Sequence, residues 1–129
     1  MIALPTQFVS IDGQLGATET THTDLGDIDV PIGASKITGI CVELGCELGY
    51  TTIGFLAWGK LSWTGSGELD GIPANFCQST ATGQVFYVPK FIPVDIPVVG
   101  GHTTVMCEMR THVALTGQTQ HGKICLRFE

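Results

Sequence analysis

Histidines and acidic residues are the side chains of this sequence that could bind a metal ion. The four histidines are His22, His102, His112 and His121. No two of them form a His-x-His or His-x-x-x-His pair, the spacings that present two ligands to one ion. His102 and His112 would lie about 33 Å apart along a strand, so they cannot share an ion within it. We therefore expect no metal here and interpret the histidines as exposed strand or loop residues.

Acidic residues cluster beside a glycine at Asp24, Asp27 and Asp29. They could ligate Ca²⁺ if their loop met the one that carries Glu68 and Asp70. Their spacing does not match an EF-hand loop, and acidic residues beside glycine are common in turns. We expect a turn, and leave open whether the Asp24/Asp27/Asp29 loop binds an ion.

The cysteines follow no metal or redox motif. They are Cys41, Cys46, Cys77, Cys107 and Cys125. Their number is odd, they include no Cys-x-x-Cys pair and no secretory signal is visible, so we expect reduced thiols. In strands, Cys46 and Cys107 would lie on the apolar sides. Cys41 and Cys125 would lie on the more polar sides, which leaves open a cross-link between them or with a neighbouring subunit.

No arrangement for nucleophilic or phosphate chemistry stands out. No serine lies in a Gly-x-Ser-x-Gly motif, and no cysteine has a neighbouring histidine to activate it. Residues 54–61 approach the spacing of a phosphate-binding P-loop, but Leu61 stands where a hydroxyl must meet Mg²⁺. We therefore expect no catalytic residue, no cofactor site and no enzyme activity.

Aromatic residues could form a platform for a sugar or another hydrophobic ligand. The candidates are Phe55, Trp58, Trp63, Phe86, Tyr87 and Phe91. At strand spacing, aromatic side chains more often fill a sandwich core or a subunit contact, and we favour that interpretation. The alternative function is a binding module for a carbohydrate or protein ligand.

The elements that position these residues are β-strands, the clearest of which is predicted over 102–116. Thr103 and every second residue after it face one side, and the residues between them include Glu108 and Arg110. A period of two indicates a strand with one buried face. Residues 36–48 alternate in the same way.

Other segments carry strand or turn formers. We expect strands over 6–11, 28–33, 51–64, 84–88 and 123–129. We expect a turn at Asp12-Gly13, a poorly defined polar segment over 14–23, loops over 65–71 and 117–122, and irregular structure over 72–82. The prolines of 89–97 predict an edge strand or an extended connection. Gly54 and Gly59 predict a bulge or a close backbone approach.

No stretch longer than ten residues carries the apolar pattern of a helix. Seven to nine short strands, without an internal repeat or a linker, predict a single domain over 1–129. The expected fold class is an all-β, antiparallel β-sandwich with little or no helix.

Composition limits the partners. The net charge is −6 and the six lysines and arginines are spread singly, so we expect no direct contact with nucleic acid. No window approaches 18 apolar residues and no signal peptide is visible, so we expect no membrane span and synthesis in a cytosol. Only 14% of residues are charged, against about 25% in typical soluble domains, which favours surface hidden against protein partners.

The segment from Asp29 to Ile40, a short strand and a Pro-Gly turn that lead into a long strand, resembles small jelly-roll structural proteins of viruses. The long final strands and the near absence of helix add to the resemblance. It implies a jelly roll in the virion, made in the host cytoplasm, that assembles with copies of itself and other shell proteins and needs no small-molecule substrate. Capsid proteins of small RNA viruses often carry a basic N-terminal arm, which is missing here. We therefore expect a decoration, outer-shell or spike-base subunit, or a capsid around a genome condensed by other proteins.

Overall fold

The computed structural model describes residues 6–15, 21–46, 57–63, 67–80, 83–84, 90–111 and 120–129. Its strands are β1 (Gln7–Leu15), β2 (Thr23–Asp29), β3 (Lys36–Cys46), β4 (Ala57–Trp63), β5 (Gly67–Pro73), β6 (Asn75–Thr80), β7 (Gly83–Gln84), β8 (Ile92–Pro97), β9 (Thr104–Thr111) and β10 (Gln120–Phe128). These ranges contain no helix. A helix able to cross a membrane is accordingly not found among them.

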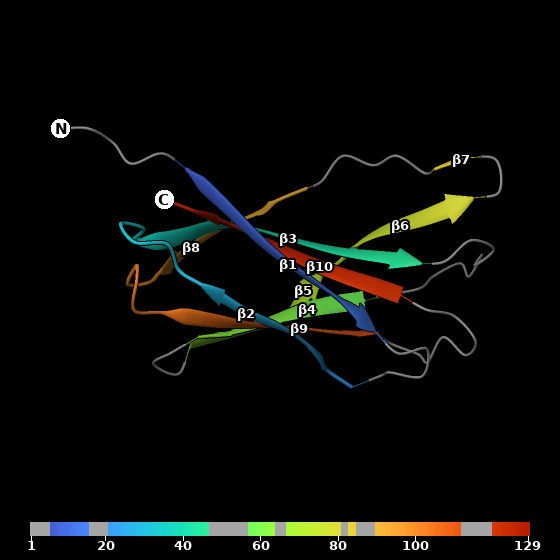
Figure 1. Ribbon diagram of the computed structural model, residues 1–129, viewed down its shortest axis with the longest axis horizontal. Helices are drawn as coiled ribbons and strands as arrows, with labels where there is room; N and C mark the ends of the chain where they lie inside the picture. Colours follow the sequence, from blue (N-terminus) through green and yellow to red (C-terminus); the bar gives the residue numbers. More distant parts are fainter. Residues whose placement is uncertain are drawn as a thin grey trace.

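The strands form two facing sheets (Figure 1). The four-stranded sheet has the order β2-β9-β4-β5. The six-stranded sheet has the order β1-β10-β3, beyond which β3 is flanked by β8 along its first half and by β6 along its second. The strand pairs are antiparallel except for β3 and β6, which run parallel over four residue pairs.

The antiparallel pairings are nested along the chain. β1 pairs with β10, β2 with β9, β3 with β8, and β4 with β5. Such a chain is one long hairpin wrapped around a core, and the contacts of β10 with β3 and of β9 with β4 complete the two sheets. This is the jelly-roll topology, with β6 and β7 added between β5 and β8. The predicted all-β sandwich of jelly-roll type is confirmed.

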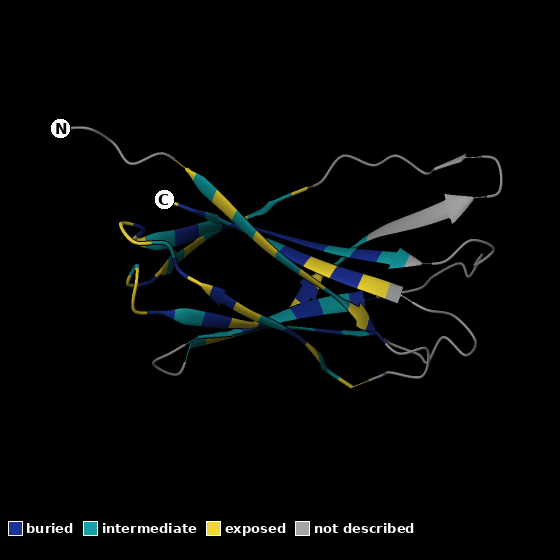
Figure 2. Cartoon of the chain, in the orientation of Figure 1, coloured by how far each residue is buried: buried dark blue, intermediate teal, exposed yellow. Residues whose placement is uncertain are grey.

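The core lies between the sheets because alternate residues of each strand face inward (Figure 2). In β10, Ile124, Leu126 and Phe128 are fully buried, whereas His121 and Lys123 are exposed. In β9 and at the residue before it, the buried residues are those that the period of two predicts, namely Thr103, Val105, Cys107, Met109 and Thr111. Removing these apolar faces from water is the main force that holds the sandwich together.

Gly59 confirms the predicted close approach. A Cβ atom there would lie 2.7 Å from Cγ2 of Val42 and 3.5 Å from Cδ1 of Ile124, both in the opposite sheet. The β4–β5 register also shifts between Gly59 and Leu61, so the predicted bulge is present as well. Gly54 lies outside the described residues.

The predicted turn at Asp12-Gly13 is wrong. β1 continues through both residues, and Gly13 lies opposite Gly122 of β10. A Cβ atom on Gly13 would lie 3.2 Å from Cδ2 of Leu25. This glycine therefore provides room for β2 rather than a turn conformation.

Several other predicted boundaries are also wrong. The loop over 65–71 and the irregular segment over 72–82 contain β5 and β6, and the loop over 117–122 contains the start of β10. The strand over 28–33 is instead β2, which ends at Asp29. Pairing with distant strands outweighs the local preference of such Gly-rich segments. The Pro-rich segment does form an edge strand, β8, as predicted.

Candidate interaction surface at the tip of the sandwich

Two loops meet at one end of the sandwich, at the left in Figure 1. They are residues 30–35, between β2 and β3, and residues 98–103, between β8 and β9, and together we call them the tip. The amide of Val30 donates to the carbonyl of Thr103 at 2.9 Å, and the amide of Gly101 donates to the carbonyl of Val30 at 2.9 Å. Because the loops satisfy each other's backbone groups, the tip has one defined shape.

Glycines are required for this shape. Gly33 and Gly101 have φ angles of 93° and 78°, in the left-handed region that other residues rarely adopt. A Cβ atom on Gly100 would collide with the carbonyl oxygens of Pro31 and Ala34. The local sequence thus selects this conformation.

Two apolar side chains of the tip are exposed to solvent. Ile32 is 87% exposed and Val99 is 62% exposed, while Val30 and Val98 beneath them are buried. Burying an isoleucine or valine fully is worth about 1.5 to 3 kcal/mol, and this chain does not gain that energy at Ile32. The energy is available to a partner that covers the tip.

A hollow of about 470 Å³ lies beside Ile32. Its polar lining includes Asp29, His102 and Thr104, and the Thr104 hydroxyl donates to the Asp29 carboxylate at 3.2 Å. An apolar centre next to a polar rim is the usual composition of a protein interface. A second hollow of about 290 Å³ is lined by Pro73, Ala74, Asn75, Lys90 and Ile92.

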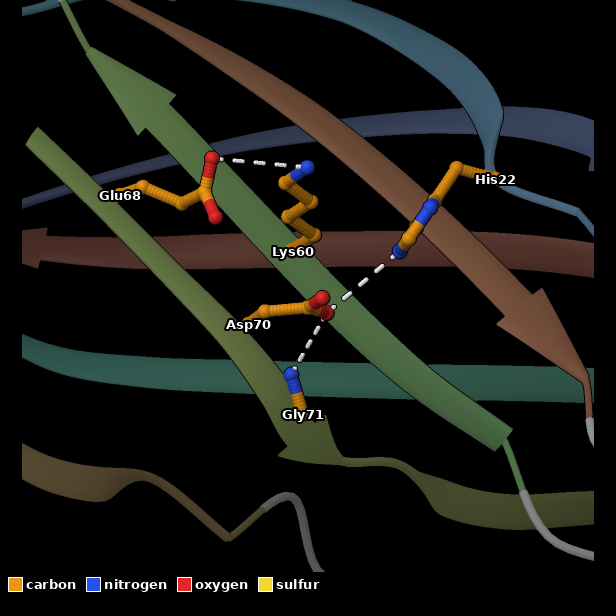
Figure 3. Close-up of polar contacts among 5 residues, drawn as sticks. All are labelled: His22, Lys60, Glu68, Asp70 and Gly71. Carbon is orange, nitrogen blue, oxygen red and sulfur yellow. Dashed lines mark hydrogen bonds and ion pairs between the residues drawn. The ribbon is translucent and has the colours of Figure 1, made fainter. Parts of the chain in front are cut away.

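Polar contacts also cross the outer face of the four-stranded sheet (Figure 3). Nε2 of His22 lies 3.4 Å from a carboxylate oxygen of Asp70, and Nζ of Lys60 lies 3.5 Å from Glu68. Burial is the largest single influence on the pKa of Asp70 and raises it. The hydrogen bond from the Gly71 amide and the nearby His22 together outweigh burial and lower that pKa overall. With 40% of the Asp70 side chain exposed, these are surface ion pairs of small energetic weight.

The histidines and aspartates do not come together as ligands. In the described ranges, no three His, Cys, Asp or Glu side chains lie close enough to hold a metal ion. His102 is exposed at the tip and His121 is exposed on β10, while His112 lies outside the described residues. The prediction of a loop or turn at Asp24, Asp27 and Asp29 is wrong, because all three residues lie on β2. Asp24 accepts a hydrogen bond from the Gly26 amide at 2.8 Å.

Two of the cysteines lie opposite each other. Cys41 of β3 and Cys125 of β10 are cross-strand neighbours, on the outward side that the sequence predicts, and both are free thiols. Cys41 is nevertheless only 1% exposed, and the Asn75 amide donates to its sulfur at 3.7 Å. Burial raises the pKa of Cys41 to about 11, that of Cys107 to about 12 and that of Cys125 above its usual value. The side chains of Cys46 and Cys77 are not among those that the structure describes.

The three aromatic candidates that the structure describes form no common platform. Trp58 lies on the outer face of β4, with the Arg110 guanidinium 4.7 Å from its ring centre. Trp63 packs against the core, under Gly67. Phe91 contacts Phe8, with ring centres 5.6 Å apart. Phe55, Phe86 and Tyr87 lie outside the described ranges, as do residues 54–56 of the P-loop-like segment, whose described part is strand β4.

The residues of the tip were not predicted from the sequence. Ile32 was expected at the end of a strand, but it lies in a turn that the Ala34 amide closes by donating to the Pro31 carbonyl at 3.1 Å. The position of Ile32 between Pro31 and Gly33 could have indicated its exposure, because proline and glycine favour turns, and turns lie at the surface and expose their side chains.

Topology and site together define this protein as a jelly-roll β-sandwich with an exposed apolar tip. Among solved structures, it is similar to a structure of infectious bursal disease virus, Gx strain, with 12% sequence identity and a TM-score of 0.46. The match covers 95% of this chain and 32% of that one, so this chain spans about a third of the length of the chain it matches. No family model and no curated protein match this sequence.

Proposed function

We propose that this protein is a non-enzymatic structural subunit of a virion, as part of a capsid, a decoration layer or a spike base, and that its tip contacts neighbouring shell proteins. The observation that carries the proposal is the rigid exposure of Ile32 and Val99. The jelly roll supports it as an architecture that builds viral capsids, although lectins and cupins also use it. In this proposal the chain is a single domain over 1–129. Its partners are copies of itself and other shell proteins.

The tip variants Ile32→Asp and Ile32→Val test the proposal. We expect native material to contain the protein in assemblies visible by negative-stain electron microscopy, and the purified protein to join them or to self-associate. Ile32→Asp should abolish binding to these assemblies, because it would place a charge in the apolar contact at the tip. Ile32→Val should preserve it.

Folding is checked by circular dichroism, and Met106→Ser serves as a control at an apolar position outside the tip, since Met106 is 36% exposed on β9. Binding to the assemblies that survives Ile32→Asp unchanged would refute a role of the tip. A monomer at every concentration, with no assembly in native material, would refute the structural function itself.

A further inference from the structure

Within the described ranges, β1 leaves one edge of the six-stranded sheet open. It pairs with β10 along all nine of its residues with no register shift. Its other edge has no strand partner in the part of the chain that the structure describes. Nine residues of strand extend about 30 Å, and an edge of this length is a template for adding another strand.

The other long edges of the described sheets are protected. β2 has a register shift between Asp24 and Gly26 and carries acidic residues, and β5 has two residues opposite Lys60 and ends at Pro73. β8 contains Pro93 and ends at Pro97. Bulges, charges and prolines are the devices that keep sheet edges from pairing. β1 has no bulge and no proline, and Asp12 is its only charged residue.

The core is also incompletely covered along this edge. Val9 and Ile11 of β1 point inward but remain only half-buried. Their neighbours on β10, Leu126 and Ile124, are fully buried. A strand added beside β1 would cover the remaining apolar surface of Val9 and Ile11, so pairing would bury side chains as well as satisfy backbone groups.

We propose that β1 pairs with β1 of a second copy of this chain, antiparallel about a two-fold axis, so that two six-stranded sheets become continuous. A two-fold axis presents the same open edge to itself, which closes both edges in one contact. In a β1–β1 pair, Asp12 would face the Asp12 of the second copy in only one register, and a neutral residue in every other. Pairing of β1 with β2 of a second copy would instead bring Asp12 close to the aspartates of β2. The inference rests on the proposed assembly function only in taking a second copy as the partner, and it is independent of the tip.

Amide hydrogen exchange of the full chain tests the pairing, compared between about 5 µM and about 500 µM protein, with sedimentation equilibrium to measure size. We expect dimers at the higher concentration. Peptides that cover residues 7–15 should exchange more slowly there, because the outward amides of β1 become hydrogen-bonded.

Two lysine variants of β1 separate pairing from general changes in charge. In Val9→Lys the ammonium group can reach water past the open edge of a monomer, but a second strand would bury it, so we expect the dissociation constant to rise about tenfold or more. In Ser10→Lys the same charge sits on the exposed outer face, and we expect a change of about threefold or less. Circular dichroism and thermal unfolding verify that both variants fold.

Each alternative result overturns the pairing. Protection of residues 7–15 that does not depend on concentration would mean that the edge is covered within one chain. Dimers protected only at 30–35 and 98–103 would overturn β1 pairing while supporting the proposed function. A folded wild-type monomer at both concentrations would overturn the pairing, and binding of the tip to native assemblies would still report on the proposed function separately.

Discussion

Cys107 lies fully buried between the sheets, where its thiol acts as a small apolar side chain. Burial raises its pKa to about 12, with a further contribution from Asp27, and raises that of Cys41 to about 11. The thiolate is the reactive form of cysteine. Both thiols therefore remain protonated in the folded protein near neutral pH, which accords with a structural role for them.

The raised thiol pKa values predict alkaline destabilisation. In the unfolded chain these thiols ionise near their ordinary pKa of 9.0. The stabilisation is therefore complete below pH 9 and is lost as the pH rises through the folded values, by at most about 1.4 kcal/mol per pH unit for each thiol. Urea denaturation from pH 8 to pH 11 measures it. Cys107→Ala should show a shallower pH dependence than the wild type, and an identical dependence would contradict the assignment.

At the scale of the element, β3 carries two glycines on the same outer face with different surroundings. A Cβ atom on Gly39 would lie 3.0 Å from Cζ of Arg127. That guanidinium donates to the Thr38 hydroxyl at 3.0 Å and to the Thr38 carbonyl at 2.8 Å, so it is not free to move. A Cβ atom on Gly45 would meet only the carbonyl of His121, at 3.8 Å. One glycine makes room for a fixed side chain, and the other does not.

The two alanine substitutions should therefore differ in sign or size. Gly39→Ala must displace Arg127 and weaken its hydrogen bonds, so we expect a loss of about 1 to 2 kcal/mol in the free energy of unfolding. Gly45→Ala should be neutral or stabilise by about 0.5 kcal/mol, because alanine restricts the unfolded chain. Urea denaturation of both variants measures the difference. Equal effects would mean that the Arg127 contact does not constrain Gly39.

At the scale of the whole molecule, the buried faces could be predicted and the strand partners could not. The period of two in β9 and β10 depends only on neighbouring residues, so it indicates which side chains face the core. The partner of β1 is at the other end of the chain, and no local pattern specifies it. The exposure of Ile32 likewise depends on hydrogen bonds between Val30 and Thr103, which are close only after folding. The turn predicted at Asp12-Gly13 was wrong for the same reason, because Gly13 makes room for β2, which the local sequence does not show.

Charge is distributed unevenly over the molecule. The outer face of the four-stranded sheet carries Asp24, Asp27, Asp29, Glu68, Asp70 and Glu108. Its basic residues are Lys60 and Arg110. The two surfaces proposed for contacts, the tip and the β1 edge, are less charged. Copies of the chain therefore repel one another at long range while the proposed contacts are formed by apolar side chains and backbone groups.

Self-association should consequently strengthen with salt. Each copy has a net charge of −6, and the screening length falls from about 30 Å at 0.01 M to about 10 Å at 0.1 M ionic strength, which reduces the repulsion. We expect the dissociation constant from sedimentation equilibrium to fall several-fold across this range. Asp27→Asn, on the acidic outer face, should strengthen association at low salt and have little effect at high salt. Association that weakens as salt is added would show instead that ion pairs hold the copies together, and both proposed contact surfaces would then be wrong.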